Sequence, residues 1–296
     1  MKKLRAILKK AFIFLLGGCE KFSDENFSKV LYWIEFMKVS NILQPISFNE
    51  HISRLKTLKE TETLSTYTDK YAVREYVARV SGSEYLNEIL GVYDSFDEID
   101  FSSLPDRFAL KCTHSSGFNV IVKDKNQVKL QDIKKKFDKW LKTNYYHVNR
   151  ERNYRYIKPR ILCDAYLESE NGHLDEYKLF CFNGKVRLIQ HNKETSKERY
   201  ANLYDENWRL LDVEYGYPRH QGSELPNNKN EMVKVAEELS AIFCFVRVDL
   251  YNLSGKIYFS ELTFHPSGGH IRFNPQDFDK VLGMYFTEEK SEPECA

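Results

Sequence analysis

Two carboxylates lie on the arms of a predicted β-hairpin in the segment FCFVRVDLYNLSGKIYFSELTFHPSGGH (243–270). Asp249 belongs to the first arm, where apolar and polar residues alternate, and Glu261 belongs to the second arm, after a turn at 252–255. Carboxylates inside apolar strands need a cation to offset the cost of their desolvation. Oxygen ligands on neighbouring strands suit Mg²⁺, which keeps several waters and takes further ligands from substrate phosphates. The alternative is a solvent-exposed polar face of the same hairpin, because surface carboxylates are common.

A lysine on a second predicted hairpin is a candidate phosphate ligand. Lys111 lies on the predicted strand 108–112, and the small-residue loop 114–117 leads to a second strand at 119–122. The charge of the lysine and the amides of the loop can together hold phosphate oxygens. No Gly-Lys-Ser/Thr sequence follows, so this is not a Walker A loop. The alternative is that the loop serves only as the turn of the hairpin.

Two further basic residues lie in the segment TDKYAVREYVARV (68–80), which is predicted to form one amphipathic helix with Asp69 near its N-cap. Lys70 and Arg74 are four residues apart and would share one face of that helix. They are therefore interpreted either as a pair that binds an anionic ligand or as solvated charges.

The composition is that of a globular protein rich in β-structure. The chain has 296 residues, of which 42% are hydrophobic and 14% aromatic, and this length suffices for one large or two ordinary domains. Its 44 basic and 43 acidic residues give a formal net charge of +1, so no overall field favours nucleic acid. The Tyr- and Arg-rich segment 145–160 is therefore interpreted as a contact surface for an anionic small molecule or a sugar. Six cysteines without CxxC spacing give no indication of a zinc site.

Several elements are predicted around these candidate ligands. The Asn183-Gly184 pair predicts a tight turn in a hairpin over 176–190, and 161–168 is an apolar strand with the acid Asp164 in its interior. Helices are predicted at 30–39, 50–59, 132–143 and 231–241.

The N-terminus is predicted to form a basic amphipathic helix. One face carries the apolar residues Leu4, Ile7, Leu8, Ala11, Phe12 and Leu15, and the basic residues before position 11 lie mostly elsewhere. The apolar run is too short to span a bilayer. The pattern is typical of a helix that lies in a membrane interface. The alternatives are a helix packed on the domain and a secretion signal, although Lys9 and Lys10 interrupt the latter.

The order of these segments resembles an ATP-grasp domain: a strand with a lysine, a small-residue loop, a strand, a helix, an acidic hinge strand, antiparallel strands, a helix and the final hairpin. From about Phe48 onward the chain is similar to the bacterial ATP-grasp family of teichuronopeptide and surface-polysaccharide biosynthesis. The resemblance is carried by DKYAVREYV, GVYDSFDEIDF, FALKCTHSSGFN, YKLFCFNGKV, EYGYP and GKIYFSELTFHPSGG.

This resemblance implies an α+β fold of the ATP-grasp type with a helical N-terminal extension. The extension would comprise residues 1–66 and the ATP-grasp domain residues 67–296. Within that domain, a phosphate-loop subdomain would span about 104–163 and a metal-binding subdomain about 164–296.

The resemblance also implies roles for individual residues. It assigns the ATP contacts to Lys70, Lys111, Ser115, Ser116, Gly117, Asp164, Tyr166, Leu167 and Glu176. Among them, the segment from Asp164 to Leu167 would be the adenine hinge. Asp249, Glu261 and Thr263 would hold Mg²⁺, and Arg247 would act with Lys111 in catalysis by facing the acyl phosphate.

The function implied is that of an ATP-dependent ligase, with ATP and Mg²⁺, which joins an amine to a carboxylate through an acyl phosphate. We expect the carboxylate to belong to a polysaccharide or sugar-linked substrate such as a uronic acid, and the amine to be an amino acid or amino sugar. We expect no nucleic-acid partner, and a cytoplasmic protein attached peripherally to the inner face of the bacterial membrane. A glycosyltransferase of surface-polysaccharide assembly and a non-catalytic ATP-binding scaffold are the alternatives.

Overall fold

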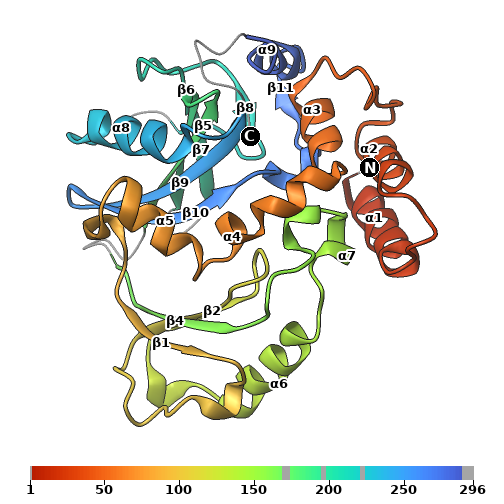
Figure 1. The fold of residues 1–296 in the computed structure, drawn as a ribbon. Coiled ribbons are helices and arrows are strands. Elements are labelled where there is room, and N and C mark those ends of the chain that lie inside the picture. The colour runs from red at the N-terminus through yellow and green to blue at the C-terminus, as the bar shows by residue number, and fades with distance from the viewer. Residues whose placement is uncertain (1, 169–173, 195–197, 221–223, 289–296) are drawn as a thin grey trace.

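The small sheet of the molecule carries the predicted phosphate-binding lysine. The computed structural model describes residues 2–168, 174–194, 198–220 and 224–288, and in it two antiparallel sheets lie one above the other (Figure 1). The lower, four-stranded sheet has the order β1-β4-β2-β3 and is covered by helix α6, whose Ile133 and Phe137 are buried against it. The bounds of these elements are β1 Ile89–Tyr93, β2 Phe108–Cys112, β3 Asn119–Val122, β4 Ile161–Ala165 and α6 Leu130–Leu141.

The large sheet carries the two predicted metal-binding carboxylates on adjacent strands, the edge strand β10 and its neighbour β9. It has five strands in the order β10-β9-β5-β6-β7. Their bounds are β5 Asp175–Phe182, β6 Lys185–Glu194, β7 Arg199–Tyr204, β9 Phe245–Leu253 and β10 Lys256–Thr263. The turn between β5 and β6 is formed by Asn183 and Gly184, which both have positive φ angles, of 50° and 76°. This confirms the predicted Asn-Gly turn, because a type I′ turn needs positive φ at both central residues.

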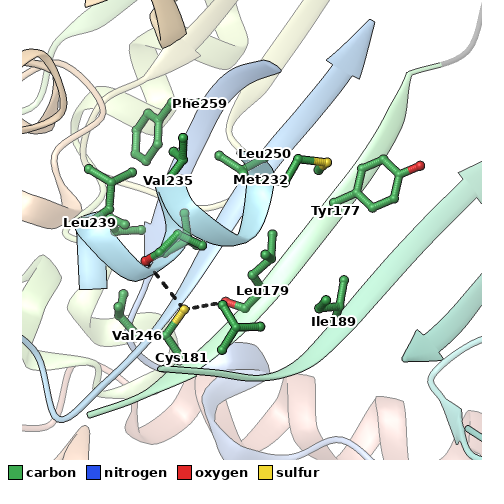
Figure 2. Packing of buried hydrophobic residues seen from close by; sticks show 14 of the residues in the cluster. Tyr177, Leu179, Cys181, Ile189, Met232, Val235, Leu239, Val246, Leu250 and Phe259 are labelled. Carbon is green, nitrogen blue, oxygen red and sulfur yellow. Dashed lines mark hydrogen bonds between the residues drawn. The ribbon is translucent and has the colours of Figure 1, made fainter. Parts of the chain in front are cut away.

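Helix α8 (Lys229–Ser240) covers one face of the large sheet. Figure 2 shows Met232, Val235 and Leu239 of this helix packed against strand residues that include Leu179 and Val246. On β9 these apolar residues alternate with polar ones, so the opposite face of the strand is free to carry Arg247, Asp249 and Tyr251.

The other face of the large sheet is packed against elements from both ends of the chain. Phe48 of α3 (Phe48–Leu55) makes edge-on ring contacts with Phe180, Phe182, Phe245 and Phe273. The short strands β8 (Glu214–Tyr215) and β11 (Phe273–Asn274) and helix α9 (Phe278–Met284) complete this layer. The domain boundary at residue 66 stays a prediction, and in the structure α3 shares this core with the large sheet.

The first two helices lie beside the segment that follows α6. They are α1 (Lys2–Leu16) and α2 (Asp24–Phe36), and Figure 1 shows α1 next to α7 (Tyr146–Asn149). The hydroxyl of Tyr146 in α7 donates a hydrogen bond to Asp24 at the start of α2. The predicted apolar stripe of α1 is exposed at Leu4, Ile7, Leu8 and Leu15. No helix among the described residues combines the length and apolar character needed to cross a membrane.

A buried ion pair anchors these helices. The guanidinium of Arg150 is 1% exposed; it lies 2.9 Å from Asp24 and also donates hydrogen bonds to the carbonyls of Leu16 and Cys19, at the end of α1. The second carboxylate oxygen of Asp24 lies 2.7 Å from Arg152. Because both partners are buried, their desolvation is offset only while the pair is intact.

Substitution of Asp24 should therefore destabilise the protein strongly. Asp24→Ala leaves Arg150 buried without its counterion, and we expect a loss of about 3–5 kcal/mol in the free energy of unfolding, measured by urea denaturation. Asp97→Ala is the matched control, since it removes a carboxylate that is paired with Lys134 at the surface. Equal urea midpoints for the two variants would contradict the proposed anchoring role.

Candidate active site

A cavity of about 1190 Å³ is lined by side chains of both sheets. The small sheet contributes Lys111 and Asn119, and the large sheet contributes Glu176, Arg247 and Glu261. Helix α1 also reaches the cavity. The predicted site residues that line it are Lys111, Ser116, Tyr166, Leu167, Glu176, Arg247, Glu261 and Thr263.

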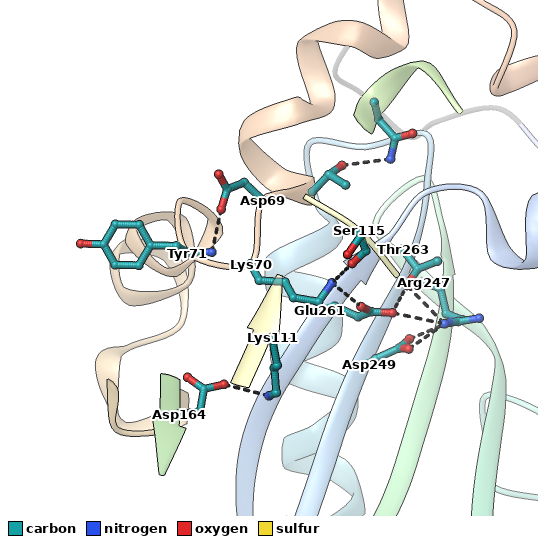
Figure 3. Close-up of polar contacts among 12 residues, drawn as sticks. Asp69, Lys70, Tyr71, Lys111, Ser115, Asp164, Arg247, Asp249, Glu261 and Thr263 are labelled. Carbon is teal, nitrogen blue, oxygen red and sulfur yellow. Dashed lines mark hydrogen bonds and ion pairs between the residues drawn. The ribbon is translucent and has the colours of Figure 1, made fainter. Parts of the chain in front are cut away.

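Asp249 lies beneath the cavity wall and is fully buried. Its two carboxylate oxygens each lie 2.6 Å from the guanidinium of Arg247, and Lys178 on the neighbouring strand β5 lies 2.9 Å from Asp249 (Figure 3 shows the Arg247 contact). Burial lowers the pKa of Arg247, but the Asp249 carboxylate more than offsets this effect and the net shift is upward. The alternative of a solvent-exposed hairpin face is therefore wrong for Asp249.

Glu261 reaches the cavity because strand β10 has a bulge. The register shifts between Phe259, which pairs with Leu250, and Glu261, which pairs with Asp249. Phe259 packs in the core under α8, and the extra residue between them turns Glu261 to the opposite face. Strict alternation would have placed Phe259 and Glu261 on the same face.

Several cations surround Glu261. Lys70 lies 3.3 Å from its carboxylate and Arg247 3.9 Å, and the hydroxyl of Thr263 donates a hydrogen bond to it over 3.0 Å. Burial alone would raise the pKa of Glu261, but Lys70, Lys178 and Arg247 together lower it to about 2. The carboxylate is therefore ionised throughout the neutral range.

The oxygen donors of this cluster fit Mg²⁺. Asp249 and Glu261 are paired directly opposite each other on neighbouring strands, and Thr263 adds a neutral hydroxyl. Mg²⁺ is commonly held by one or two carboxylates plus waters and substrate phosphates. Within the described ranges no three His, Cys, Asp or Glu side chains gather as a metal-binding group, so a Mg²⁺ ion here would depend on water and phosphate for its remaining ligands.

Lys111 forms an ion pair across the small sheet. Its ammonium group lies 2.8 Å from Asp164 on the adjacent strand β4 (Figure 3). Asp164 is buried and holds the lysine instead of lining the cavity, whereas Ala165, Tyr166 and Leu167 do line it. An adenine contact by Asp164 stays a prediction.

The predicted loop after Lys111 is only partly at the cavity. Ser116 lines it, whereas Ser115 is fully buried and its carbonyl accepts a hydrogen bond from Lys70 over 2.8 Å. Gly117 has a φ angle of 76°, a conformation that favours glycine. Lys70 thus contacts this loop as well as the carboxylate of Glu261.

Lys70 and Arg74 do not share a helix face as predicted. Helix α4 (Ser65–Thr68) ends before Lys70, and α5 (Val73–Val80) begins after it. The side chain of Asp69 accepts hydrogen bonds from the backbone amides of Tyr71 and Ala72 within this break. Lys70 therefore points to Glu261, whereas Arg74 donates to the carbonyl of Asn87.

Glu176 and Lys178 form a second charged pair on the cavity wall. They are two residues apart on β5 and lie 2.9 Å from each other, and Glu176 also accepts a hydrogen bond from Asn192. Sequence reasoning identified Glu176 but missed Lys178. The spacing of the two residues could have predicted the Lys178 contact, because residues i and i+2 of a strand share one face.

Two more lining residues were missed. Lys9 of α1 and Glu151, which follows α7, both line the cavity. The sequence placed Lys9 on a membrane-binding helix, and no spacing connected either residue with the metal-binding hairpin.

Residues 50–287 match the family model of the TupA-like ATPgrasp proteins. The chain belongs to the TupA-like ATP-grasp family. This confirms the predicted family and the α+β ATP-grasp fold; the link to teichuronopeptide lies in the family's name.

One solved structure similar to this TupA-like chain is the D-alanine–D-alanine ligase from Bacillus anthracis complexed with ATP, with 16% identity and a TM-score of 0.42. The match covers 68% of this chain and 57% of the ligase chain. A second is the ATP-grasp ligase PsnB complexed with minimal precursor, with 9% identity and a TM-score of 0.41; the match covers 80% of this chain and 67% of PsnB. A third is the D-cycloserine synthetase DcsG, with 14% identity and a TM-score of 0.40; the match covers 75% of this chain and 69% of DcsG. The chain thus spans little more than half the length of the first of these ligases. No curated protein sequence matches it.

Because Asp249 is buried, its substitution should lower the free energy of unfolding. Asp249→Asn leaves Arg247 and Lys178 without their shared counterion, and we expect a loss of about 3–5 kcal/mol in the free energy of unfolding measured with urea. Glu261→Gln should change the urea midpoint much less, because the Glu261 side chain is 28% exposed. A midpoint for Asp249→Asn within error of the unsubstituted protein would exclude the buried pair as a stabilising element.

Proposed function

We propose that this protein is an ATP-dependent ligase that joins an amine to a carboxylate. The observation that carries the proposal is the convergence of Lys70, Lys178 and Arg247 on Asp249 and Glu261, at one cavity of an ATP-grasp fold. Cations that surround an ionised carboxylate pair in this way suit a substrate with several phosphate charges and a divalent metal ion.

ATP would lie along the cavity from the hinge to the carboxylates. Ala165, Tyr166 and Leu167 line the hinge end and would contact the base, and Glu176 would contact the ribose. Lys111 and Ser116 line the same cavity and would contact the phosphates. Each basic group is held by an acid in the structure, Lys111 by Asp164 and Lys70 by Glu261, so these cations would exchange carboxylate partners for phosphate oxygens.

The proposed reaction has two steps. A carboxylate oxygen of the first substrate attacks the γ-phosphorus, the bond to the ADP oxygen breaks, and an acyl phosphate forms. The nitrogen of the amine then attacks the acyl carbon, phosphate leaves with its electron pair, and the amine loses a proton. Arg247 lines the cavity and would stabilise the negative charge that develops on the acyl oxygen during this attack.

Asp249, Glu261 and Thr263 would hold Mg²⁺, which supplies charge neutralisation on the transferred phosphoryl oxygens. Asp249 is paired with Lys178 and Arg247 in the structure, so it would become available to the ion only if these two cations turned toward phosphate. No side-chain nucleophile is required by this chemistry.

The carboxylate substrate proposed here is a sugar acid of bacterial surface-polysaccharide biosynthesis. Tyr145, Tyr154, Tyr215 and Tyr217 line the cavity, and such rings offer both an apolar face and a hydroxyl to a sugar. The family's name provides the further support for this substrate class.

Glu261→Gln tests the metal-binding carboxylate. We expect ADP release from ATP and Mg²⁺, measured with glucuronate or galacturonate and an amine, to fall by about 100-fold or more, since one preorganised electrostatic contact contributes about 3 kcal/mol to transition-state stabilisation. Glu206→Gln makes the same chemical change at an exposed position and should leave ADP release unchanged.

Lys111→Ala tests whether this lysine contributes to ATP binding. It should weaken ATP affinity measured by calorimetry, because the phosphates lose a cation.

Unchanged ADP release by Glu261→Gln would exclude this residue as the proposed metal ligand. Release of a nucleoside diphosphate only from a nucleotide sugar would favour a glycosyltransferase. ATP binding without ADP release under any combination would favour a scaffold.

We further propose that α1 attaches the protein to the inner face of the bacterial membrane. Its outward residues include Ile7, Phe14 and Leu15, which are 62%, 88% and 72% exposed, and the helix contains five basic residues and no acid. Burial of apolar side chains and attraction to anionic lipid, about 1 kcal/mol per basic residue near the surface, would act together.

The membrane proposal is tested by the double variant Ile7→Ser/Leu15→Ser. It should lose flotation with phosphatidylglycerol vesicles at low salt, while ADP release stays unchanged because these side chains are exposed rather than lining the cavity. Ile242→Ser/Val281→Ser makes the same change at two exposed apolar residues far along the chain and should float like the unsubstituted protein. If the unsubstituted protein fails to float, α1 has a structural role only.

A further inference from the structure

The end of the cavity next to α1 carries two charges of opposite sign that the proposed phosphoryl transfer does not use. They are the ammonium group of Lys9 and the carboxylate of Glu151, and both residues line the cavity. Helix α1 contacts α7, the element that immediately precedes the Glu151 segment, so α1 forms part of the wall at this end (Figure 1).

Lys9 has no close counterion. Within the described part of the chain no carboxylate lies within 4 Å of its ammonium group, although Glu35 and Glu151 attract it from further away. Burial lowers the pKa of Lys9 in spite of this attraction. A partly buried cation without a partner on a cavity wall is a candidate ligand for an anion.

Among the residues that the structure describes, Glu151 has no cationic partner within 4 Å. One oxygen accepts a hydrogen bond from the side-chain amide of Asn149 over 2.9 Å, and the other lies 3.8 Å from His265, which is neutral because burial lowers its pKa to about 3. The carbonyl oxygen of the Asn149 side chain is buried and has no hydrogen-bond partner. Glu151 and Asn149 therefore present neighbouring acceptor atoms, a suitable arrangement for an ammonium group.

The surroundings of Glu151 disfavour its charge. The groups that act on it electrostatically are Lys56 just after α3, Lys9 from α1 and Glu261 from β10, and burial is the largest effect and raises its pKa. Lys56 is itself fully buried and donates a hydrogen bond to the carbonyl of Gly268 instead of contacting Glu151. An ammonium group of a ligand would offset the cost of keeping this carboxylate ionised.

The cavity as a whole has room for a second substrate beside ATP. A volume of about 1190 Å³ lies above the usual range of about 300–1,000 Å³ for the pocket of one ligand. The hinge residues and Lys111 occupy the ATP end in the proposed function. Arg247 and Glu261 lie on the same cavity wall as Glu151, so a ligand there would be next to the reacting carboxylate.

We propose that Lys9 and Glu151 bind the amine substrate, and that this substrate carries an anionic group close to its amine. The ammonium group lies between Glu151 and the side-chain carbonyl of Asn149, and the anionic group pairs with Lys9. An amino acid has this combination of charges, and so does a small amine that bears a phosphate. The inference rests on the proposed ligase function and names the class of its amine substrate.

The test measures binding, so that it is independent of turnover. Full-length protein with Mg²⁺ and a non-hydrolysable ATP analogue is titrated with the proteinogenic amino acids, phosphoethanolamine and glucosamine 6-phosphate, and the thermal midpoint is followed. We expect at least one of these zwitterions to raise the midpoint, whereas ethylamine and acetate do not.

Variants then assign the two charges. Lys9→Met and Glu151→Gln should each weaken the affinity for the best zwitterion by about 10- to 100-fold, as expected for loss of one hydrogen bond between charged groups. Lys10→Met and Glu60→Gln, at exposed positions, should bind it normally. Lys9→Arg keeps the charge and should restore most of the affinity.

Ligand analogues distinguish direct contact from a structural effect. The unsubstituted protein should prefer the zwitterion to a derivative whose anionic group is neutralised, and Lys9→Met should lose this preference. Glu151→Gln should lose the preference over the N-acetyl derivative. If the ATP analogue raises the midpoint but no zwitterion does, or if both variants retain their preferences, this inference is wrong. If the ATP analogue itself has no effect, the proposed function fails instead.

Discussion

The buried pair of Arg247 and Asp249 is the interaction on which the site depends. It lies on β9, in the interior of the large sheet, with Lys178 of β5 on the other side of the same carboxylate. The opposite face of β9 packs under α8, so the strand has no freedom to move these charges into solvent. Buried charges of this kind are tolerated only in paired geometry, and this requirement fixes the positions of the surrounding side chains.

From this pair outward, three lysines near the carboxylates are each held by an acid. Lys178 also contacts Glu176, Lys70 contacts Glu261, and Lys111 contacts Asp164. The site is thus preorganised for a polyanion but electrically balanced without one. Binding such a ligand exchanges these ion pairs for new ones and does not create charge contacts from isolated groups, which limits the net gain in free energy from each contact.

Local sequence patterns predicted much of the fold. The alternation in β9 and the Asn183-Gly184 turn each follow from the conformational preferences of a few adjacent residues, and the structure has them where they were expected. The break between α4 and α5 was not predicted, because Asp69 is compatible with either a cap at the start of a longer helix or a cap within it. Helix propensity alone does not distinguish these two positions of the cap.

The site itself was predicted where a charged residue is out of place in an apolar strand, as for Asp249 and Glu261. Lys9 and Glu151 lie in segments where charges are ordinary, and only tertiary packing brings them to the cavity. The Lys111–Asp164 pair was missed for a related reason. It depends on β4 lying next to β2, whereas β3 is the next strand along the chain.

The bulge in β10 has a consequence for how this protein family can diverge. One extra residue, Ser260, lies between Phe259, which packs in the core with Leu262, and Glu261, which faces the cavity. Loss of that single codon would restore regular pairing and keep Glu261 opposite Asp249 on the cavity face, because adjacent residues of a strand point to opposite faces. Relatives whose strand is one residue shorter would therefore retain this acid at the cavity, and it would match position 261 only across a one-residue gap in a sequence alignment.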